Sequence, residues 1–343
     1  MKKYLILILI TLLLSYNTAL AVTYTVCSSG CDETQVEDVL DNSDVEPGDI
    51  IQLTESVSES DMITWGTGDE GSSGGGYVTL DLNGFTLAIT ISTYGIYIDN
   101  PDYIKIQDGI ITADGAGDGN SIVVIKATSD HITIDNCTID GPNGSGNSIY
   151  GVYIVADTSD VTNITIEDST FKELTKGIYA LSLNSSAGSP KAILVQRNTF
   201  YDIDQGVKTN ADGITFGGSN ALDCTGSIIE HNLVYNYCDT GIDTYLASNI
   251  EVRYNVVHTT ISGGDQDGYK LSTTTNNTGV KFHHNIAYDI GGNGIYIGEV
   301  SADIYNNTFY NIGYVALYQP SDSDQGTLNI KNNIMQKVGA GGS

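Results

Sequence analysis

Residues 250–258 read IEVRYNVVH, and this stretch decides the fold because its pattern recurs along the chain. Residues 228–235 (IIEHNLVY) and 280–288 (VKFHHNIAY) repeat it: an apolar strand, then an asparagine three positions after its last apolar residue, then another apolar residue two positions further on. Short alternating segments of this kind are typical of strands with one buried face. The chain is therefore composed of repeating units that each contribute short strands.

The asparagine position aligns along the chain as a column of small or amide residues: Gly109, Cys137, Ser169, Asn198, Asn232, Asn255, Asn285, Asn307 and Asn333. The spacing in this column varies from 22 residues, between Asn285 and Asn307, to 34 residues, between Asn198 and Asn232. Stacked asparagine amides can bond both the backbone of a turn and the amide of the next turn, which pairs buried polar groups. We therefore expect an asparagine ladder along one edge of a solenoid.

Units too short to bury a face alone, joined by such turns, specify an all-β fold of the parallel β-helix type. The handedness of crossovers between parallel strands makes a right-handed parallel β-helix the expected form. A propeller needs four strands in each unit, which is more than these units hold. Leucine-rich repeats would need leucines that are scarce here.

Three segments are expected along the chain. Residues 1–21 are predicted to be a signal peptide, because two lysines precede a short apolar run and small residues follow at a cleavage site. Residues 22–76 are predicted to be an N-terminal cap that ends in a Gly/Ser-rich loop. Residues 77–343 are predicted to be the β-helix, and we expect it to be incomplete at its C-terminal end, since the last unit stops before its second strand.

The cap is expected to contain one short helix. Asp32 is placed to cap it, with Gln35 three residues on, and its apolar stripe is Val36, Val39 and Leu40.

Five cysteines follow the predicted signal peptide. In an oxidising compartment Cys27 and Cys31 are spaced to close a small loop, and Cys224 with Cys238 is a candidate second disulfide. Cys137 falls in the small-residue column and is expected to be a buried thiol. No pair has the spacing of zinc ligands.

The formal net charge of −28 at pH 7 restricts the partners. It argues against nucleic acid and against anionic membranes, because both attract basic proteins. The apolar run near the N-terminus is too short to span a bilayer. We expect a monomer exported to the periplasm, the cell surface or the medium. An acidic polysaccharide would be repelled by this chain unless divalent cations bridged the two, since hard cations bind several carboxylate oxygens.

Three short phrases indicate a candidate site: residues 210–214 (NADGI), 239–243 (DTGID) and 267–271 (DGYKL). Aligned on their glycine, they give two columns of side chains if the phrases are stacked strands of one sheet. The first column holds Asp212, Thr240 and Asp267, and the second holds Thr215, Asp243 and Lys270.

Outward-facing residues of one column lie about 4.8 Å apart in adjacent coils. Asp243 is therefore expected directly beside Lys270, with Asp239 at the loop edge. Carboxylates this close repel one another and raise one another's pKa unless a cation binds them. The phrases predict a calcium ion and a catalytic base together on one outer face.

A further column, three residues after each asparagine, holds the rings of Tyr201, Tyr235, His258, Tyr288 and Tyr310. Stacked rings on an outer face can hold sugars, but a packing ladder that stabilises the solenoid is the better explanation of this column.

The three phrases resemble those of polysaccharide lyase family nine, the calcium-dependent pectate lyases, which have a pectin lyase-like right-handed parallel β-helix. That family has an Asn-Ala-Asp-Gly phrase, then Asp-Asp-Gly-x-Asp, then Gly-aromatic-Lys, in this order. The resemblance covers about residues 210–297. It implies that Asp212, Asp239 and Asp243 bind Ca²⁺ and that Lys270 is the base.

Thr240 departs from this pattern, because the family has its second aspartate there. A neutral hydroxyl is a poorer calcium ligand than a carboxylate. We hypothesise that Asp267, one coil further in the same column, supplies the lost charge as a metal ligand.

The resemblance implies calcium-assisted β-elimination on a uronate polymer such as pectate, with activity that rises at alkaline pH because Lys270 must be neutral. A lone outward lysine is usually a solvated charge, but three phrases in register favour a site. Two alternatives stay open. One is a non-catalytic glycan-binding or surface-adhesion protein with structural calcium, and the other is a lyase or hydrolase for another acidic polysaccharide, such as alginate.

Overall fold

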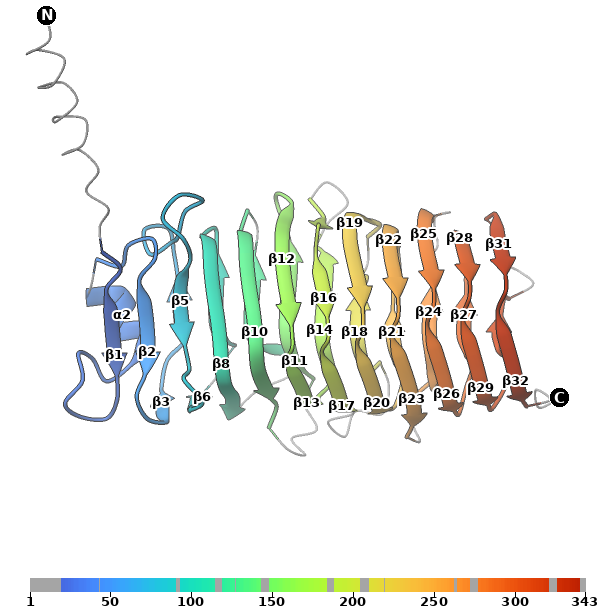
Figure 1. Ribbon diagram of the computed structural model, residues 1–343, viewed down its shortest axis with the longest axis horizontal. Helices are drawn as coiled ribbons and strands as arrows, with labels where there is room; N and C mark the ends of the chain where they lie inside the picture. Colours follow the sequence, from blue (N-terminus) through green and yellow to red (C-terminus); the bar gives the residue numbers. More distant parts are fainter. Residues whose placement is uncertain are drawn as a thin grey trace, which may run out of the picture.

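A computed structural model describes residues 20–42, 44–90, 93–114, 119–126, 128–142, 148–183, 188–203, 210–218, 220–261, 264–271, 277–320 and 326–339. The described strands stack side by side into an elongated solenoid, from the N-terminal strands to the C-terminal ones (Figure 1). The predicted all-β parallel β-helix is confirmed. Nearly all of the predicted signal peptide, and residues 340–343, lie outside the described residues.

The strands form two sheets, which we call sheet A and sheet B. Sheet B has ten strands that come from successive coils: β4 (Ile63–Trp65), β7 (Tyr94–Asp99), β9 (Asn120–Lys126), β11 (Ile149–Ala156), β14 (Lys176–Ser182), β18 (Asp212–Phe216), β21 (Thr240–Asp243), β24 (Asp267–Leu271), β27 (Ile295–Ile297) and β30 (Leu317–Tyr318).

Sheet A has 22 strands: β1 (Thr23–Val26), β2 (Ile50–Leu53), β3 (Val57–Glu59), β5 (Val78–Asp81), β6 (Thr86–Thr90), β8 (Asp102–Asp114), β10 (Asp130–Asp140), β12 (Val161–Glu167), β13 (Thr170–Leu174), β15 (Pro190–Lys191), β16 (Leu194–Gln196), β17 (Thr199–Ile203), β19 (Leu222–Glu230), β20 (Leu233–Tyr237), β22 (Ala247–Arg253), β23 (Val256–Thr260), β25 (Asn277–His283), β26 (Ile286–Ile290), β28 (Val300–Tyr305), β29 (Thr308–Ile312), β31 (Leu328–Lys331) and β32 (Ile334–Val338). In most coils two of these strands follow one another around a turn.

In the core, the side chains at equivalent positions of successive coils stack on one another. Ile132 of β10 pairs in parallel with Ile104 of β8 on one side and with Ile164 of β12 on the other, and all three side chains are fully buried. Further along, Phe171 and Phe200 stack with their ring centres 4.7 Å apart. Burying these rows supplies the hydrophobic stabilisation that no single coil can reach alone.

The asparagine ladder is present along the turn between the two strands of each coil. The backbone N–H of Asn232 donates to Oδ1 of Asn255 (3.0 Å), and the N–H of Asn255 donates to Oδ1 of Asn285 (3.0 Å). The side-chain amide of Asn255 also donates to the carbonyl oxygen of Ile229 (2.9 Å). Each buried amide thus bonds backbone groups of the preceding coil, and Asn255 also bonds the carbonyl oxygen of Arg253 in its own coil (3.0 Å).

The residue before each ladder asparagine has left-handed backbone geometry. His231 and Tyr254 both have a φ of 56°, and His284 has a φ of 57°. Non-glycine residues adopt this conformation at a cost of about 1 kcal/mol. The asparagine bonds offset this cost, because the sharp turn brings the amide to its partners.

The short helix of the cap is α2 (Val36–Asn42), and its predicted apolar residues are buried. Asp32 does not cap it: this carboxylate accepts bonds from the N–H and hydroxyl of Thr25. The N–H of Val36 instead donates to Oε1 of Glu59 (2.6 Å), which comes from strand β3. No described helix is both long and apolar enough to cross a membrane.

Strands of the predicted cap continue the solenoid. β1 pairs in parallel with β2, and β2 pairs in parallel with β5, the first strand after residue 76. The parallel register of sheet A therefore runs through the predicted boundary.

One of the two predicted disulfides is present. Cys27 and Cys31 are bonded, with their Cα atoms 5.6 Å apart. The prediction for Cys224 and Cys238 is wrong: these two residues form no disulfide within the described structure, and both are fully buried in the apolar core. Cys224 lies in β19 and Cys238 follows β20, so each fills a different part of the coil. Cys137 is a buried thiol, as expected.

Four rings of the aromatic column, those of Tyr201, Tyr235, His258 and Tyr288, form a continuous stack. Tyr235 stacks on Tyr201 and on His258, with both pairs of ring centres 5.3 Å apart, and His258 stacks on Tyr288 at 4.6 Å. This geometry agrees with the explanation that the rings pack on one another and stabilise the solenoid.

Replacing Asn255 by alanine should lower the free energy of unfolding by about 2–6 kcal/mol, because it leaves the N–H of Asn232 and the carbonyl of Ile229 without these partners, at about 1–3 kcal/mol each. Urea unfolding measures the loss. Asn329 is the control, since its side chain is exposed on β31 and its amide bonds Asp303 of the adjacent strand. Equal losses for Asn255→Ala and Asn329→Ala would contradict a stabilising ladder.

Glu59→Gln should flatten the pH dependence of stability. Burial raises the pKa of Glu59 to about 7, above the value of about 4.3 expected in the unfolded chain. The folded state therefore binds the proton more tightly, and stability falls as pH rises from about 4.3 to about 7. Unfolding midpoints across this window should fall less in Glu59→Gln than in the parent. The exposed Glu46→Gln is the control, and an unchanged slope in Glu59→Gln would refute the assignment.

Candidate functional site

The three phrases of the candidate site are adjacent strands of sheet B. Thr215 of β18 pairs with Asp243 of β21, and Asp243 pairs with Lys270 of β24. Thr240 pairs with Asp267 in the other column. Both predicted columns are therefore present in the predicted register.

We call the side chains of these two columns, together with Asp239, the charged row. Its carboxylates are buried, although the sequence analysis placed them on an outer face. Asp212 and Asp267 are at most 1 % exposed, and Asp239 and Asp243 are below 10 %. Lys270 is more accessible, with 22 % of its side chain exposed. It is therefore the ionisable member of the predicted set that solvent reaches best.

A column of glycines brings these strands close to the core. A Cβ atom on Gly241 would lie 2.3 Å from Cγ1 of Val257 and 2.7 Å from the carbonyl oxygen of Gly268. On Gly213 it would lie 2.6 Å from Cγ1 of Val234. The glycine that aligns the three phrases is required because core side chains and the next strand occupy the space of a side chain.

The structure adds Lys176 to the site, which the sequence analysis missed. Lys176 of β14 pairs with Asp212 of β18, and its ammonium forms an ion pair with Oδ2 of that carboxylate. Both side chains are almost completely buried. The signal was present in the sequence, because Lys176-Gly177-Ile178 has the same glycine pattern and Lys176 precedes the glycine.

The oxygens of Asp212 have several other partners. Oδ2 also accepts a hydrogen bond from the hydroxyl of Thr215 (2.9 Å), and Oδ1 accepts one from the N–H of Thr240 (3.1 Å). Two further aspartates bond backbone on neighbouring loops: Asp239 accepts from the N–H of Asp265, and Asp267 from the N–H of Asn293.

Burial dominates the electrostatics of the row. It raises the pKa of Asp243 to about 7, helped by the charge of Asp212, and it raises the pKa of Asp267 to about 6. Burial alone lowers the pKa of Lys270, but Asp243, Asp239 and Asp265 outweigh it and hold that pKa above its ordinary value. Lys270 Nζ lies 3.9 Å from Asp265, an exposed carboxylate.

Calcium binding by Asp212, Asp239, Asp243 and Asp267 stays a prediction, and the donor set does not fit it well. Oδ1 of Asp243 is buried and has no hydrogen-bond partner among the described residues, so one oxygen is open to a cation. Asp212, however, already binds an ammonium. These four aspartates also do not gather three carboxylate oxygens within 4.8 Å of one another. A calcium ion bound through Asp212 would lie against Lys176.

One group of three carboxylates does meet that distance within the described residues: Asp135, Glu167 and Asp168, on sheet A. Basic side chains neutralise it. Arg197 lies 2.6 Å from both Glu167 and Asp168, and Lys105 lies 2.9 Å from Asp135.

Tyrosines flank the charged row on both sides within sheet B. Tyr179 pairs with Thr215, and the ammonium of Lys176 lies 5.4 Å from its ring centre. On the other side Tyr296 pairs with Lys270, whose Nζ lies 5.7 Å from the ring centre. Aromatic faces beside ammonium groups stabilise the cations and offer stacking surfaces.

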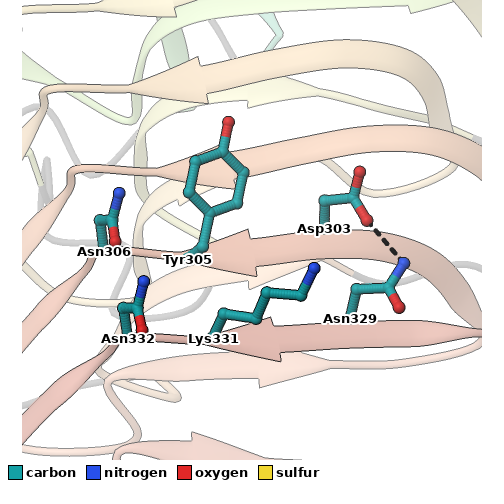
Figure 2. Close-up of a pocket in the computed structure, with 6 residues that line it drawn as sticks. All are labelled: Asp303, Tyr305, Asn306, Asn329, Lys331 and Asn332. Carbon is teal, nitrogen blue, oxygen red and sulfur yellow. Dashed lines mark hydrogen bonds between the residues drawn. The ribbon is translucent and has the colours of Figure 1, made fainter.

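A separate pocket of about 250 Å³ lies on sheet A near the C-terminal strands (Figure 2). Tyr305 of β28 and Lys331 of β31 project into it from paired positions, and the amide of Asn329 bonds Asp303 (2.8 Å). None of the predicted site residues lines this pocket.

Comparison with known proteins agrees with this architecture. The sequence model of a family described as right handed beta helix region matches residues 73–335. No curated protein sequence matches the chain.

Solved structures share the fold at low identity. An alginate lyase from Paenibacillus sp. str. FPU-7 is 17 % identical over 90 % of this chain and 99 % of its own, with a TM-score of 0.60. The GH136 lacto-N-biosidase from Eubacterium ramulus is 13 % identical over 92 % of this chain and 68 % of its own, with a TM-score of 0.56. Pectate lyase Pel9A is 13 % identical over 94 % of this chain and 78 % of its own, with a TM-score of 0.52.

Gly241→Ala should lower the free energy of unfolding by about 1–3 kcal/mol, because the added methyl overpacks the core against Val257 and the next strand. Thermal or urea unfolding measures the effect. Gly74→Ala is the matched control, since no atom lies within 4 Å of its added methyl. If both variants are equally stable, sheet B does not depend on the glycine column.

Proposed function

The chain belongs to the right-handed β-helix family, and on this basis we propose that it is a polysaccharide lyase that cleaves an acidic, uronate-containing polysaccharide such as pectate by β-elimination. Lys270 is the proposed base. The observation that carries the proposal is the position of Lys270: it is partly exposed, directly beside Asp243, and next to Tyr296 along the same row of sheet B.

The elimination needs one base at a ring carbon. Neutral Lys270 Nζ takes the proton from the carbon that carries the uronate carboxyl group. The electron pair of that bond forms a double bond to the neighbouring ring carbon, whose bond to the glycosidic oxygen breaks. That oxygen leaves with the electron pair and takes a proton from solvent. The products are a new reducing end and an unsaturated uronate at the other end.

The proposal predicts alkaline activity. Neighbouring aspartates hold the pKa of Lys270 above its ordinary value of about 10.4. The neutral fraction of the lysine therefore rises about tenfold with each pH unit between pH 7 and 10, and the rate should rise with it.

A polyanionic substrate would meet less repulsion here than the net charge of −28 suggests. The ammonium of Lys176 compensates the carboxylate of Asp212, and Lys270 places a second ammonium beside Asp243. Tyr179 and Tyr296 provide ring faces on either side of the row. The fold-level likeness to alginate and pectate lyases agrees with a sugar polymer as the substrate.

A non-catalytic glycan-binding protein is the second candidate. It is favoured by the same aspartates, because they stabilise the ammonium form of Lys270. An ammonium binds a uronate carboxylate but removes no proton. In that case the protein retains polymer without cleaving it, and Lys270→Ala weakens retention.

The test is the ultraviolet absorbance of unsaturated uronate formed from polygalacturonate and from alginate, across the alkaline range. Loss of Lys270 in Lys270→Ala should lower the rate by about 10²–10⁴-fold, the usual contribution of a general base. Lys281→Ala is the control, since Lys281 is an exposed lysine on sheet A. Cleavage that survives in Lys270→Ala would remove the proposed base, and binding without cleavage by the parent would favour the second candidate.

A further inference from the structure

Lys176 occupies the position where a cation would meet Asp212. Its ammonium bonds Oδ2 of Asp212, and lies 3.3 Å from Oδ1 of Asn210 and 3.4 Å from Oγ1 of Thr215. An ammonium has three hydrogens to donate, and three oxygens surround it. Only 4 % of the lysine side chain is exposed, so the charge is held inside the sheet.

This arrangement satisfies Asp212 without a metal. A buried carboxylate is strongly destabilising unless a charge and hydrogen bonds compensate it. Asp212 has both: the ammonium and the Thr215 hydroxyl at Oδ2, and the Thr240 N–H at Oδ1.

The charges of the neighbouring residues also favour a site without a metal ion. Thr240 removes one negative charge relative to the Asp-Asp-Gly-x-Asp pattern of the lyase family that the phrases resemble. Lys176 adds one positive charge in the same column, two coils away. Lys176 supplies one positive charge, half that of a calcium ion, and the neutral Thr240 leaves one carboxylate fewer to compensate.

We propose that the buried Lys176 ammonium takes the place of a divalent cation at this site, so that the row of Asp212, Asp243 and Asp267 folds without calcium and Asp212 binds none while Lys176 is present. Lys176 is a positioning residue: it holds Asp212, and through it the N–H of Thr240 and the strand that carries Asp243. Its consequence for turnover, a lyase insensitive to chelators, rests on the proposed function, whereas its consequence for calcium binding does not.

The experiment measures calcium binding directly. Thermal unfolding midpoints are recorded in millimolar CaCl₂ and in EDTA for the parent, Lys176→Met, the double variant Lys176→Met with Asp212→Asn, and Lys126→Met. Lys126 is the matched control, because it also pairs with an aspartate, Asp157 at 3.1 Å, on sheet B but nearer the surface.

The parent and Lys126→Met should show the same midpoint in both solutions. Lys176→Met should be less stable in EDTA and should regain stability in CaCl₂, because the released Asp212 now accepts a metal. The double variant, which has lost both charges, should fold and ignore calcium. If Lys176→Met folds only with calcium, that outcome supports the proposal as well.

Two outcomes would overturn it. One is a calcium-dependent rise in the midpoint of the parent, confirmed by calorimetric titration with CaCl₂. The other is a Lys176→Met variant that shows no response to calcium while the double variant is stable. A parent that ignores calcium and also cleaves no uronate polymer supports this inference and removes the proposed lyase activity, so the two failures are distinguishable.

Discussion

The turn beside each asparagine is the constraint on which the solenoid depends. Parallel strands must end and restart within three residues, and their backbone groups at the corner are buried. The asparagine amide bonds backbone groups of the preceding coil and the side chain of the next asparagine, while the residue before it takes a left-handed backbone conformation. Since each amide contacts two coils, the ladder fixes the register between them. Every other column of the molecule follows from that register.

The glycines of sheet B hold the strands of the site in this register. At Gly241 and Gly268 the backbone lies directly against the core and the neighbouring strand, so no side chain fits. A strand held this closely has little freedom to shift. It therefore places Asp243 beside Lys270, although 26 residues or more separate successive coils at this point of the chain.

The protein's own lysines compensate part of the negative charge in the site. Lys176 and Asp212 form a pair inside sheet B, and the remaining acids have raised pKa values because they are buried. Lys270 keeps its accessible ammonium between Asp265 and the ring of Tyr296. The site thus combines a solvent-reachable lysine with a second, buried lysine that compensates Asp212, in a protein with a strongly negative net charge. Such a combination suits recognition of a carboxylated polymer better than the total charge indicates.

The sequence by itself determined the parallel β-helix, the asparagine ladder and the two columns of the site, because these depend on side-chain period and on glycines that recur at one place in the successive coils of the site. The tertiary structure decided which groups meet and how deeply they are buried. Lys176 and Asp212 are 36 residues apart and Val36 and Glu59 are 23 residues apart, and their contacts depend on loops of unequal length. The same holds for Cys224 and Cys238, which are close in the sequence but fill separate parts of one coil. The local sequence pattern determines which way each side chain points and how the side chains are spaced along a strand. Which residues contact one another, and how deeply they are buried, is decided only when distant coils pack together.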